Sequence, residues 1–351
     1  MEKVVYLLGA GFSAPLGLPV MGDFLMKSKD MYATNRTSYK HFEEVFQTIR
    51  DMSISKNYYE ADLFNIEEIL SILEMENRLE GKKLHGSFIR YLADVITHYT
   101  PDMTPHEGSF PANWHEFLFS KVPVDTWSDY GFFIATILNL SFKEIMKRSA
   151  GGGNTREVQC HYPTNREIRY SIITLNYDMI PEKICQFINE KYDPDHRIRF
   201  KSKIEEGADE NLPTLAKLHG SIEERNIVAP TWSKDVNEKI LDAWKLAHKS
   251  LTEANHLRIL GYSLPETDAY VRYLLKSAVI KSDNLKTIDV ICFDDYGTVQ
   301  KRYDDFISFK NYRFIQKSIE SYLTENRRSQ FKDSGEMKID RLEHTHKDYF
   351  R

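Results

Sequence analysis

Cysteine is scarce in this sequence of 351 residues, and long apolar runs are missing. The three cysteines, Cys160, Cys185 and Cys292, are too widely spaced for the two Cys-x-x-Cys pairs of a zinc module. Such a small, odd set fits a reducing compartment. No window approaches the ~18 apolar residues of a membrane span, and the N-terminus lacks the pattern of a signal peptide. We therefore expect a cytoplasmic protein without a metal site or membrane contact.

An excess of positive charge is also missing. Lys and Arg number 47 against 52 Asp and Glu, which gives a formal net charge of -5. This balance argues against a protein built mainly to bind nucleic acid, and we expect no direct nucleic-acid binding. With 41% apolar and 13% aromatic residues, the composition is globular, and the length allows one large domain or one domain with a sizeable insertion.

The first distinctive stretch begins at Val4. Val4 to Leu8 is an uninterrupted apolar run, which is typical of a central strand in a sheet covered on both faces. Gly9 and Gly11 follow it, and their missing Cβ atoms permit a sharp turn in which backbone N–H groups can approach a pyrophosphate. The pattern predicts a dinucleotide-binding turn, although a strand-to-helix turn without a ligand would use the same residues.

Strand-like and helix-like segments alternate along the rest of the chain. Apolar strands are predicted at 168–175, 212–218, 256–260 and 285–293, the last as the final parallel strand, and helices follow the turns after them. This order is typical of a doubly wound, Rossmann-like parallel α/β sheet.

A helical insertion interrupts this pattern after the first unit. Asn65 begins a helix with a capping-box-like start, and the apolar residues of 131–146 predict another helix. The polar segment ending at Arg166 is predicted as a hairpin. The resulting division is an α/β catalytic domain over 1–36 and 150–317, a helical insertion over 37–149, and a charged C-terminal segment over 318–351. We expect that last segment to be a solvated helix or frayed tail, with His344 and His346 on the surface.

Two polar motifs come directly after predicted strands. Thr174-Leu175-Asn176-Tyr177-Asp178 follows one strand, and His219-Gly220 follows the next. Read alone, Asn and Asp favour turns because their side chains bond to nearby backbone, and a single His before Gly is often a core residue. In the same way Ser13 is a possible helix cap, and Gly261 and Ser263 a possible plain turn.

The motifs resemble those of the sirtuin superfamily, and more closely its SIR2-like branch of bacterial NAD-consuming immune proteins. The family pattern is Gly-Ala-Gly-x-Ser, three residues, Gly-Ile-Pro, then Thr-Gln-Asn-x-Asp, His-Gly and Gly-Thr-Ser. This chain carries, in that order, Gly9-Ala10-Gly11-Phe12-Ser13, Gly17-Leu18-Pro19, Thr174 to Asp178, His219-Gly220, and Gly261-Tyr262-Ser263. The resemblance spans residues 4 to 300.

The chain also departs from the deacylating sirtuins. Val20-Met21-Gly22 stand where those enzymes have Asp-Phe-Arg, and no cysteine lies between Ser221 and Pro230. The Arg, the aromatic residue that covers the ribose and the zinc module are therefore all missing. These departures put protein deacylation in doubt but leave NAD cleavage possible.

The resemblance implies NAD+ as the substrate and assigns roles to individual residues. His219 is the expected proton acceptor for water or a ribose hydroxyl, since a neutral imidazole is available near pH 7. Asn176 is expected to hold a water or ribose hydroxyl beside the anomeric carbon, and Asp178 to bind the nicotinamide carboxamide. The residues expected to bind the rest of the dinucleotide are Gly9, Ala10, Gly11, Phe12, Ser13, Pro19, Gly261, Ser263, and, where the family contacts adenine, Phe293 and Asp294.

The function implied is an NAD+ glycohydrolase that yields nicotinamide and ADP-ribose and depletes NAD+ in anti-phage defence. An NAD-dependent protein deacylase and a non-catalytic sensor of NAD or ADP-ribose derivatives are the alternatives. Because unrestrained hydrolysis would kill the host, we expect a homo-oligomer and a separate activating protein, of the HerA-like DNA-translocating ATPase or short Argonaute type, that acts through the helical insertion.

Overall fold

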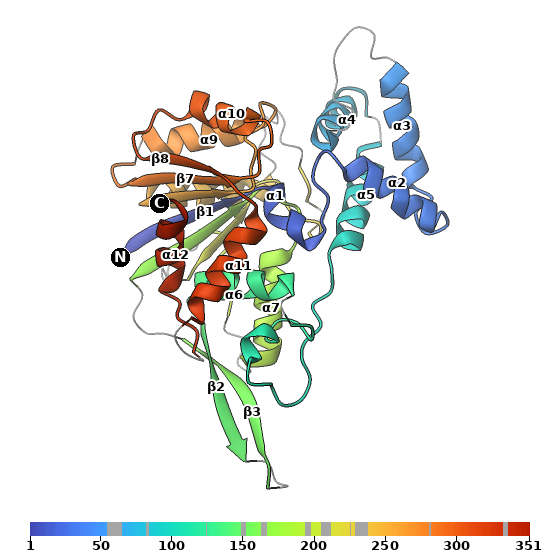
Figure 1. Ribbon diagram of the computed structural model, residues 1–351. Coiled ribbons are helices and arrows are strands. Elements are labelled where there is room, and N and C mark those ends of the chain that lie inside the picture. The colour runs from blue at the N-terminus through green and yellow to red at the C-terminus, as the bar shows by residue number, and fades with distance from the viewer. Residues whose placement is uncertain are drawn as a thin grey trace.

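A six-stranded parallel sheet forms the centre of the computed structural model (Figure 1). The structure describes residues 1–54, 65–81, 84–123, 125–148, 152–162, 167–193, 198–204, 212–224, 226–228, 238–280, 282–332 and 336–351. In spatial order the strands are β5 (Thr214–Lys217), β4 (Ile168–Thr174), β1 (Glu2–Leu8), β6 (His256–Leu260), β7 (Thr287–Cys292) and β8 (Tyr312–Gln316). All neighbours pair in parallel, which confirms the predicted α/β class.

Strand β1 is buried on both faces, as its apolar run predicts. Val4 to Leu8 are at most 1% exposed, and their side chains alternate between two hydrophobic clusters. Val4, Tyr6 and Leu8 join the cluster that includes the inner residues of α6 (Thr126–Ile137) and α11 (Ile319–Gln330). Val5 and Leu7 join the cluster under α8 (Glu238–Thr252) and α9 (Ala269–Ile280). This alternation follows from the two-residue repeat of a strand, and it accounts for helices on both faces of the sheet (Figure 1).

Helices make up most of the remaining described chain. They are α1 (Ala10–Ser13), α2 (Phe24–Thr34), α3 (Phe42–Ile54), α4 (Ile66–Glu80), α5 (Leu84–Tyr99), α6 (Thr126–Ile137), α7 (Ile180–Tyr192), α8 (Glu238–Thr252), α9 (Ala269–Ile280), α10 (Thr298–Phe306), α11 (Ile319–Gln330) and α12 (Arg341–Tyr349). Helices α2 to α5 lie together beside the end of β1 at which α1 begins (Figure 1). No described helix is long and apolar enough to cross a membrane.

The helix predicted over 131–146 is partly wrong. Helix α6 ends at Ile137, and strand β2 (Ser141–Arg148) pairs in antiparallel fashion with β3 (Asn154–His161). Asn139 adopts a left-handed conformation with φ of 56°, which ends the helical path before the strand begins. The hairpin formed by β2 and β3 projects away from the sheet (Figure 1). The predicted domain boundaries stay a prediction.

Two expectations for the C-terminal part are wrong. The strand predicted over 285–293 is not the last, since β8 pairs with β7 at the edge of the sheet. The segment after Ser318 is not a solvated tail, because α11 and α12 bury Tyr322, Leu323 and Leu342 completely. His346, expected at the surface, is 1% exposed, whereas His344 is exposed as predicted.

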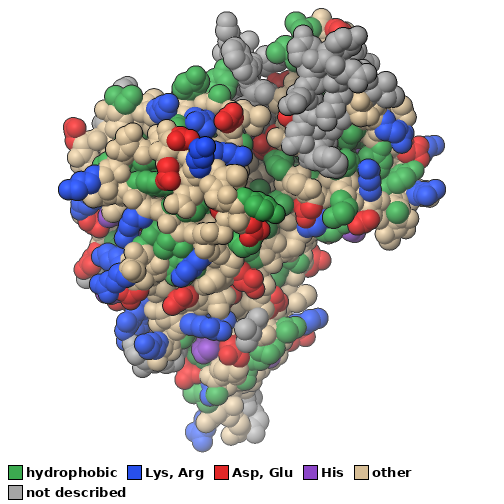
Figure 2. All heavy atoms as spheres, turned by 45° about the horizontal axis from the view of Figure 1, so that its top comes forward, with side chains coloured by type: hydrophobic (Ala, Val, Ile, Leu, Met, Phe, Trp, Pro, Cys, Tyr) green, Lys and Arg blue, Asp and Glu red, His purple; other side chains and the backbone are tan. Residues whose placement is uncertain are grey.

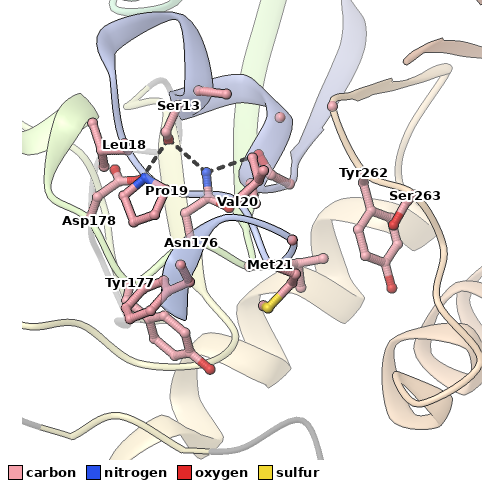
Figure 3. A pocket seen from close by; sticks show the side chains of 18 of the residues that line it. Ser13, Leu18, Pro19, Val20, Met21, Asn176, Tyr177, Asp178, Tyr262 and Ser263 are labelled. Carbon is pink, nitrogen blue, oxygen red and sulfur yellow. Dashed lines mark hydrogen bonds between the residues drawn. The ribbon is translucent and has the colours of Figure 1, made fainter. Parts of the chain in front are cut away.

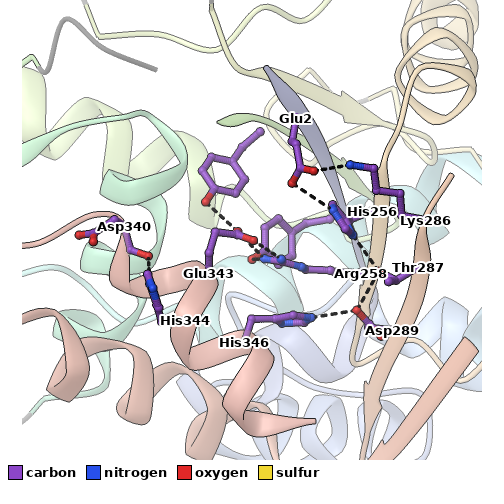
Figure 4. A network of polar contacts seen from close by, with 12 residues as sticks. Glu2, His256, Arg258, Lys286, Thr287, Asp289, Asp340, Glu343, His344 and His346 are labelled. Atoms are coloured by element: carbon purple, nitrogen blue, oxygen red, sulfur yellow. Dashed lines mark hydrogen bonds and ion pairs between the residues drawn. The ribbon is translucent and has the colours of Figure 1, made fainter. Parts of the chain in front are cut away.

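Buried polar pairs explain why a charged segment packs on the sheet (Figure 4). The Arg258 guanidinium of β6 donates two hydrogen bonds to the Glu343 carboxylate of α12, with N–O distances of 2.8 and 2.5 Å. Nε2 of His346 lies 3.1 Å from Oδ2 of Asp289 on β7. Each charge therefore has a partner, as buried charges require. Over the face shown in Figure 2, acidic and basic side chains are interspersed, in line with the nearly balanced composition.

Candidate active site

A cavity of about 580 Å³ lies at the carboxyl end of the sheet. The turns after β1, β4, β5, β6 and β7 all contribute to its lining, together with the first turn of α4. The strand order reverses at β1, with β4 on one side and β6 on the other. Open α/β sheets bind ligands at such a switch point, because the connections leave the sheet toward opposite faces there. Figure 3 shows some of the side chains that line the cavity.

Glycines hold two of these turns in direct backbone contact. The N–H of Gly9 donates to the Leu260 carbonyl at 3.0 Å, and the N–H of Gly11 donates to the Gly261 carbonyl at 2.9 Å. Gly261 has φ of +64°, and a Cβ there would stand 2.3 Å from the backbone nitrogen of Phe12. The glycines thus allow close packing of the two turns, and the N–H groups of Gly9 and Gly11 are bonded within the chain.

Ser13 connects the first turn to the Asn176 motif (Figure 3). Its hydroxyl donates to Oδ2 of Asp178 at 2.6 Å and accepts a hydrogen bond from Nδ2 of Asn176 at 2.9 Å. The same amide donates to the Gly9 carbonyl at 3.0 Å. Ser13 is not a helix cap here, since its hydroxyl bonds across to another loop. These contacts fix the orientation of both motif side chains.

His219 enters the cavity from the turn after β5. Gly220 permits this turn with φ of +79°, and the imidazole is 3% exposed. Among the described residues, neither ring nitrogen has a hydrogen-bond partner; Nε2 lies 3.7 Å from Oδ1 of Asp268. Burial lowers the pKa of His219, but the Asp268 carboxylate, followed by that of Glu67, raises it above its usual value.

Four residues that the sequence did not indicate as site residues also line this cavity: Glu67, Asp268, Tyr177 and Tyr262. Asn65 caps α4 as predicted, accepting hydrogen bonds from the N–H groups of Glu67 and Glu68. In the sequence, Glu67 is explained by its place in the first turn of a helix, where a negative charge is favourable. The helical pattern of apolar residues does not indicate that α4 faces the cavity. For Tyr262 the signal was present, since it lies between the two family residues at 261 and 263.

The remaining predicted residues divide into two groups. Ala10, Pro19, Ser263 and Phe293 line the cavity, as do the glycines, and Phe293 is 63% exposed at its rim. Phe12 and Asp294 do not line it. Phe12 is buried against Tyr130, with their ring centroids 5.0 Å apart.

Asp294 lies outside the cavity because its carboxylate serves helix α10. Its Oδ2 accepts a hydrogen bond of 2.8 Å from the backbone N–H of Gln300, close to the start of that helix. Trp232, which the sequence favours equally as a cleft-wall residue and as a core residue, lies outside the described residues. Within the described ranges, no three His, Cys, Asp or Glu side chains gather as a set of metal ligands.

Comparison with known proteins gives one family match. Residues 170–326, from β4 into α11, match the model of the SIR2-like domain. No curated protein matches the chain. These 157 residues contain the Asn176 and His219 motifs but not the first glycine turn.

Solved structures give only distant similarity. A Sir2–p53 peptide–NAD+ complex is 10% identical, with 92% of this chain and 90% of that chain covered and a TM-score of 0.37. Sir2 bound to acetylated peptide is 11% identical, with coverages of 92% and 91% and a TM-score of 0.38. A Sir2 homolog–NAD complex is 12% identical, with coverages of 99% and 90% and a TM-score of 0.36.

Proposed function

We propose that this chain, whose residues 170–326 match the model of the SIR2-like domain, binds NAD+ in the cavity and hydrolyses the bond between nicotinamide and ribose. The products are nicotinamide and ADP-ribose. The observation that carries the proposal is the buried imidazole of His219, whose two ring nitrogens have no hydrogen-bond partner in the described chain and which faces a cavity. Buried polar atoms are normally paired, so these nitrogens favour a ligand or water as their partner.

Hydrolysis of this bond requires few catalytic groups. The ribose is joined to a pyridinium, which is already a good leaving group, so no strong acid is needed. The reaction needs a placed nucleophile and stabilisation of an oxocarbenium-like transition state. His219, as a neutral base, takes a proton from water or from a ribose hydroxyl, a contribution on the order of a hundredfold or more.

Asn176 and Asp178 are suited to orient the substrate. The Asn176 amide nitrogen is held by the Gly9 carbonyl and the Ser13 hydroxyl, so its carbonyl oxygen keeps one direction toward a hydroxyl or water. Asp178 accepts from Ser13 through Oδ2 and from the Ile180 N–H through Oδ1 at 3.1 Å. A carboxylate oxygen accepts more than one hydrogen bond, so Asp178 can also bind the nicotinamide carboxamide.

The proposed biological role follows from the resemblance of the sequence motifs. A hydrolase of this kind would deplete NAD+ as an effector of anti-phage defence. Its activity would then require control, through assembly of several copies and through an activating partner of the HerA-like ATPase or short Argonaute type. Full activity of the isolated chain at every concentration would contradict this part of the proposal.

The test is to incubate the purified full chain with NAD+, with and without candidate partners, and to separate the products by chromatography. We expect equal amounts of nicotinamide and ADP-ribose without any acyl-lysine, and a loss of at least ~100-fold in His219→Ala and Asn176→Ala. His344→Ala, at an exposed helix position, is the matched control and should be fully active. Turnover only with acyl-lysine would indicate a deacylase, and binding without turnover a sensor; either result would overturn the proposal.

A further inference from the structure

Asp268 is a buried carboxylate with one oxygen held and the other free. The Tyr262 hydroxyl donates to its Oδ2 at 2.8 Å, and the side chain is 2% exposed. Its Oδ1 has no hydrogen-bond partner among the described residues and lies 3.7 Å from Nε2 of His219. The carboxylate is therefore fixed by a neighbour and directed at the imidazole.

Glu67 brings a second carboxyl group to the same cavity from a different part of the fold. It lies in the first turn of α4, whose N-terminal N–H groups are already capped by Asn65. Ile69 and Leu70, both 0% exposed, anchor this helix in the hydrophobic core. Because the cap does not use the Glu67 carboxyl group, that group is available to the cavity that it lines with His219 and Asp268.

We propose that Asp268 is the positioning residue for His219, and that Glu67 of α4 is the second carboxylate of this centre. The proposal rests on the proposed function, since it explains how His219 would act as the base. Asp268 fixes the orientation of the ring, and its carboxylate stabilises the imidazolium formed when the ring accepts a proton from water or a ribose hydroxyl. Burial raises the pKa of Glu67 to about 7, so Glu67 adds to this stabilisation in its ionised form. A separation of 3.7 Å exceeds a hydrogen bond, but catalytic contacts are often long without substrate.

The two carboxyl groups beside His219 should determine how the activity depends on pH. The charged groups that face His219 are Asp268, from the loop before α9, and Glu67, from α4; the Leu175 carbonyl also favours the protonated ring. All three raise the pKa of His219, while burial lowers it. The base form is the neutral ring, so activity should increase as pH rises through this pKa. Removing either carboxylate lowers the pKa and moves that increase to lower pH.

Kinetics of Asp268→Asn and Glu67→Gln in the full chain provide the first test. Asp268→Asn should lower kcat for nicotinamide release ~10- to 100-fold, with KM changed less than ~2-fold, and move the acidic limb of the profile to lower pH. Glu67→Gln should move the limb in the same direction. Glu68→Gln, one residue further along α4 and outside the cavity lining, is the matched control and should leave the profile unchanged. An acidic limb that stays in place in both variants would overturn the proposal.

A second measurement separates this proposal from the proposed function. Titration of ¹⁵N-histidine resonances, with His219 assigned by its loss in His219→Ala, reports the pKa without any turnover. Asp268→Asn should lower that pKa, and Tyr262→Phe, a milder change that frees Oδ2, should alter it less. If the wild type releases no nicotinamide, the proposed function fails while this titration still tests the cluster. An unchanged His219 pKa in a folded Asp268→Asn protein would refute it.

Discussion

The backbone N–H of Gly11 donates a hydrogen bond of 2.9 Å to the carbonyl oxygen of Gly261, across the gap between the turns after β1 and β6. Both turns line the cavity beside His219. A Cβ on Gly11 would stand 2.9 Å from the Gly261 Cα, and one on Gly261 would overlap the Phe12 nitrogen. The close approach of these turns therefore depends on glycine on both sides.

Gly261→Ala should destabilise the fold by several kcal/mol. The added Cβ would lie 2.3 Å from a backbone atom and would occupy a left-handed conformation with φ of +64°, so neither strain can relax by a side-chain rotation. The measurement is the free energy of unfolding in urea. Gly86→Ala is the control, since a Cβ there meets no atom within 4 Å in helix α5, and it should be neutral or stabilising by up to ~1 kcal/mol. Equal stability of the two variants would contradict the argument.

The sheet was predictable because its strands carry a strong local signal. Val4 to Leu8 are apolar without interruption, and a strand buried on both faces requires that composition. The C-terminal helices were not predictable for the opposite reason. Glu343 and His346 look like surface residues in the sequence, and their burial depends on Arg258 and Asp289, which are remote along the chain. A charge pattern does not reveal which charges find partners in the interior.

Some residues of the candidate site were likewise predictable from the sequence, and others were not. His219 and Asn176 were identified from motifs that follow strands, and the structure brings both to one cavity. Asp268 and Glu67 were missed because their place beside His219 depends on the packing of α9 and α4. Asp294 follows a strand end as well, but its carboxylate turns to the N–H of Gln300. A residue that follows a strand in the sequence can therefore be placed at the edge of the sheet, but the direction of its side chain cannot be predicted in this way.

Ser13→Ala should weaken both stability and the proposed activity. The Ser13 hydroxyl is 2% exposed and bridges Asn176 and Asp178, so its loss leaves Oδ2 of Asp178 without its donor. We expect a loss of ~1 to 3 kcal/mol in unfolding free energy and of about tenfold or more in nicotinamide release. Ser277→Ala, which removes only a hydroxyl bonded to the Leu274 carbonyl of its own helix, should change neither quantity. The measurements are the free energy of unfolding and the rate of nicotinamide release for both variants. Equal losses in Ser13→Ala and Ser277→Ala would show that the Ser13 hydroxyl has no specific role in the site.

His346 should make the protein less stable in mild acid. Burial, and then the Arg258 charge, lower its pKa from 6.5 to about 4, although Asp289 acts in the opposite direction. As pH falls from 6.5 to 4, the unfolded state binds a proton that the folded state does not, so stability declines through this window by up to roughly 3 kcal/mol. Urea unfolding at pH 7, 6 and 5 measures the slope, which should be shallower in His346→Gln. His344→Gln, at an exposed position on the same helix, should keep the wild-type slope, and a wild-type slope in His346→Gln would exclude this cause.

Removing only Arg258 from its pair with Glu343 should lower the free energy of unfolding much more than replacing both residues together. Arg258→Met leaves the Glu343 carboxylate in the interior without its guanidinium, and we expect a loss of ~3 to 5 kcal/mol in the free energy of unfolding. In the double variant Arg258→Met/Glu343→Leu no charge is left unpaired, so stability should return to within ~2 kcal/mol of the wild type.

The half-exposed pair of Lys3 and Glu253, with an N–O distance of 2.8 Å, provides the control for this experiment. Lys3→Met should cost less than ~1 kcal/mol, because solvent screens the charge that remains. Urea unfolding of the wild type, Arg258→Met, Glu343→Leu and the double variant completes a double-mutant cycle for the buried pair. Strictly additive losses for Arg258→Met and Glu343→Leu would show that the two residues do not interact energetically, which would contradict this prediction.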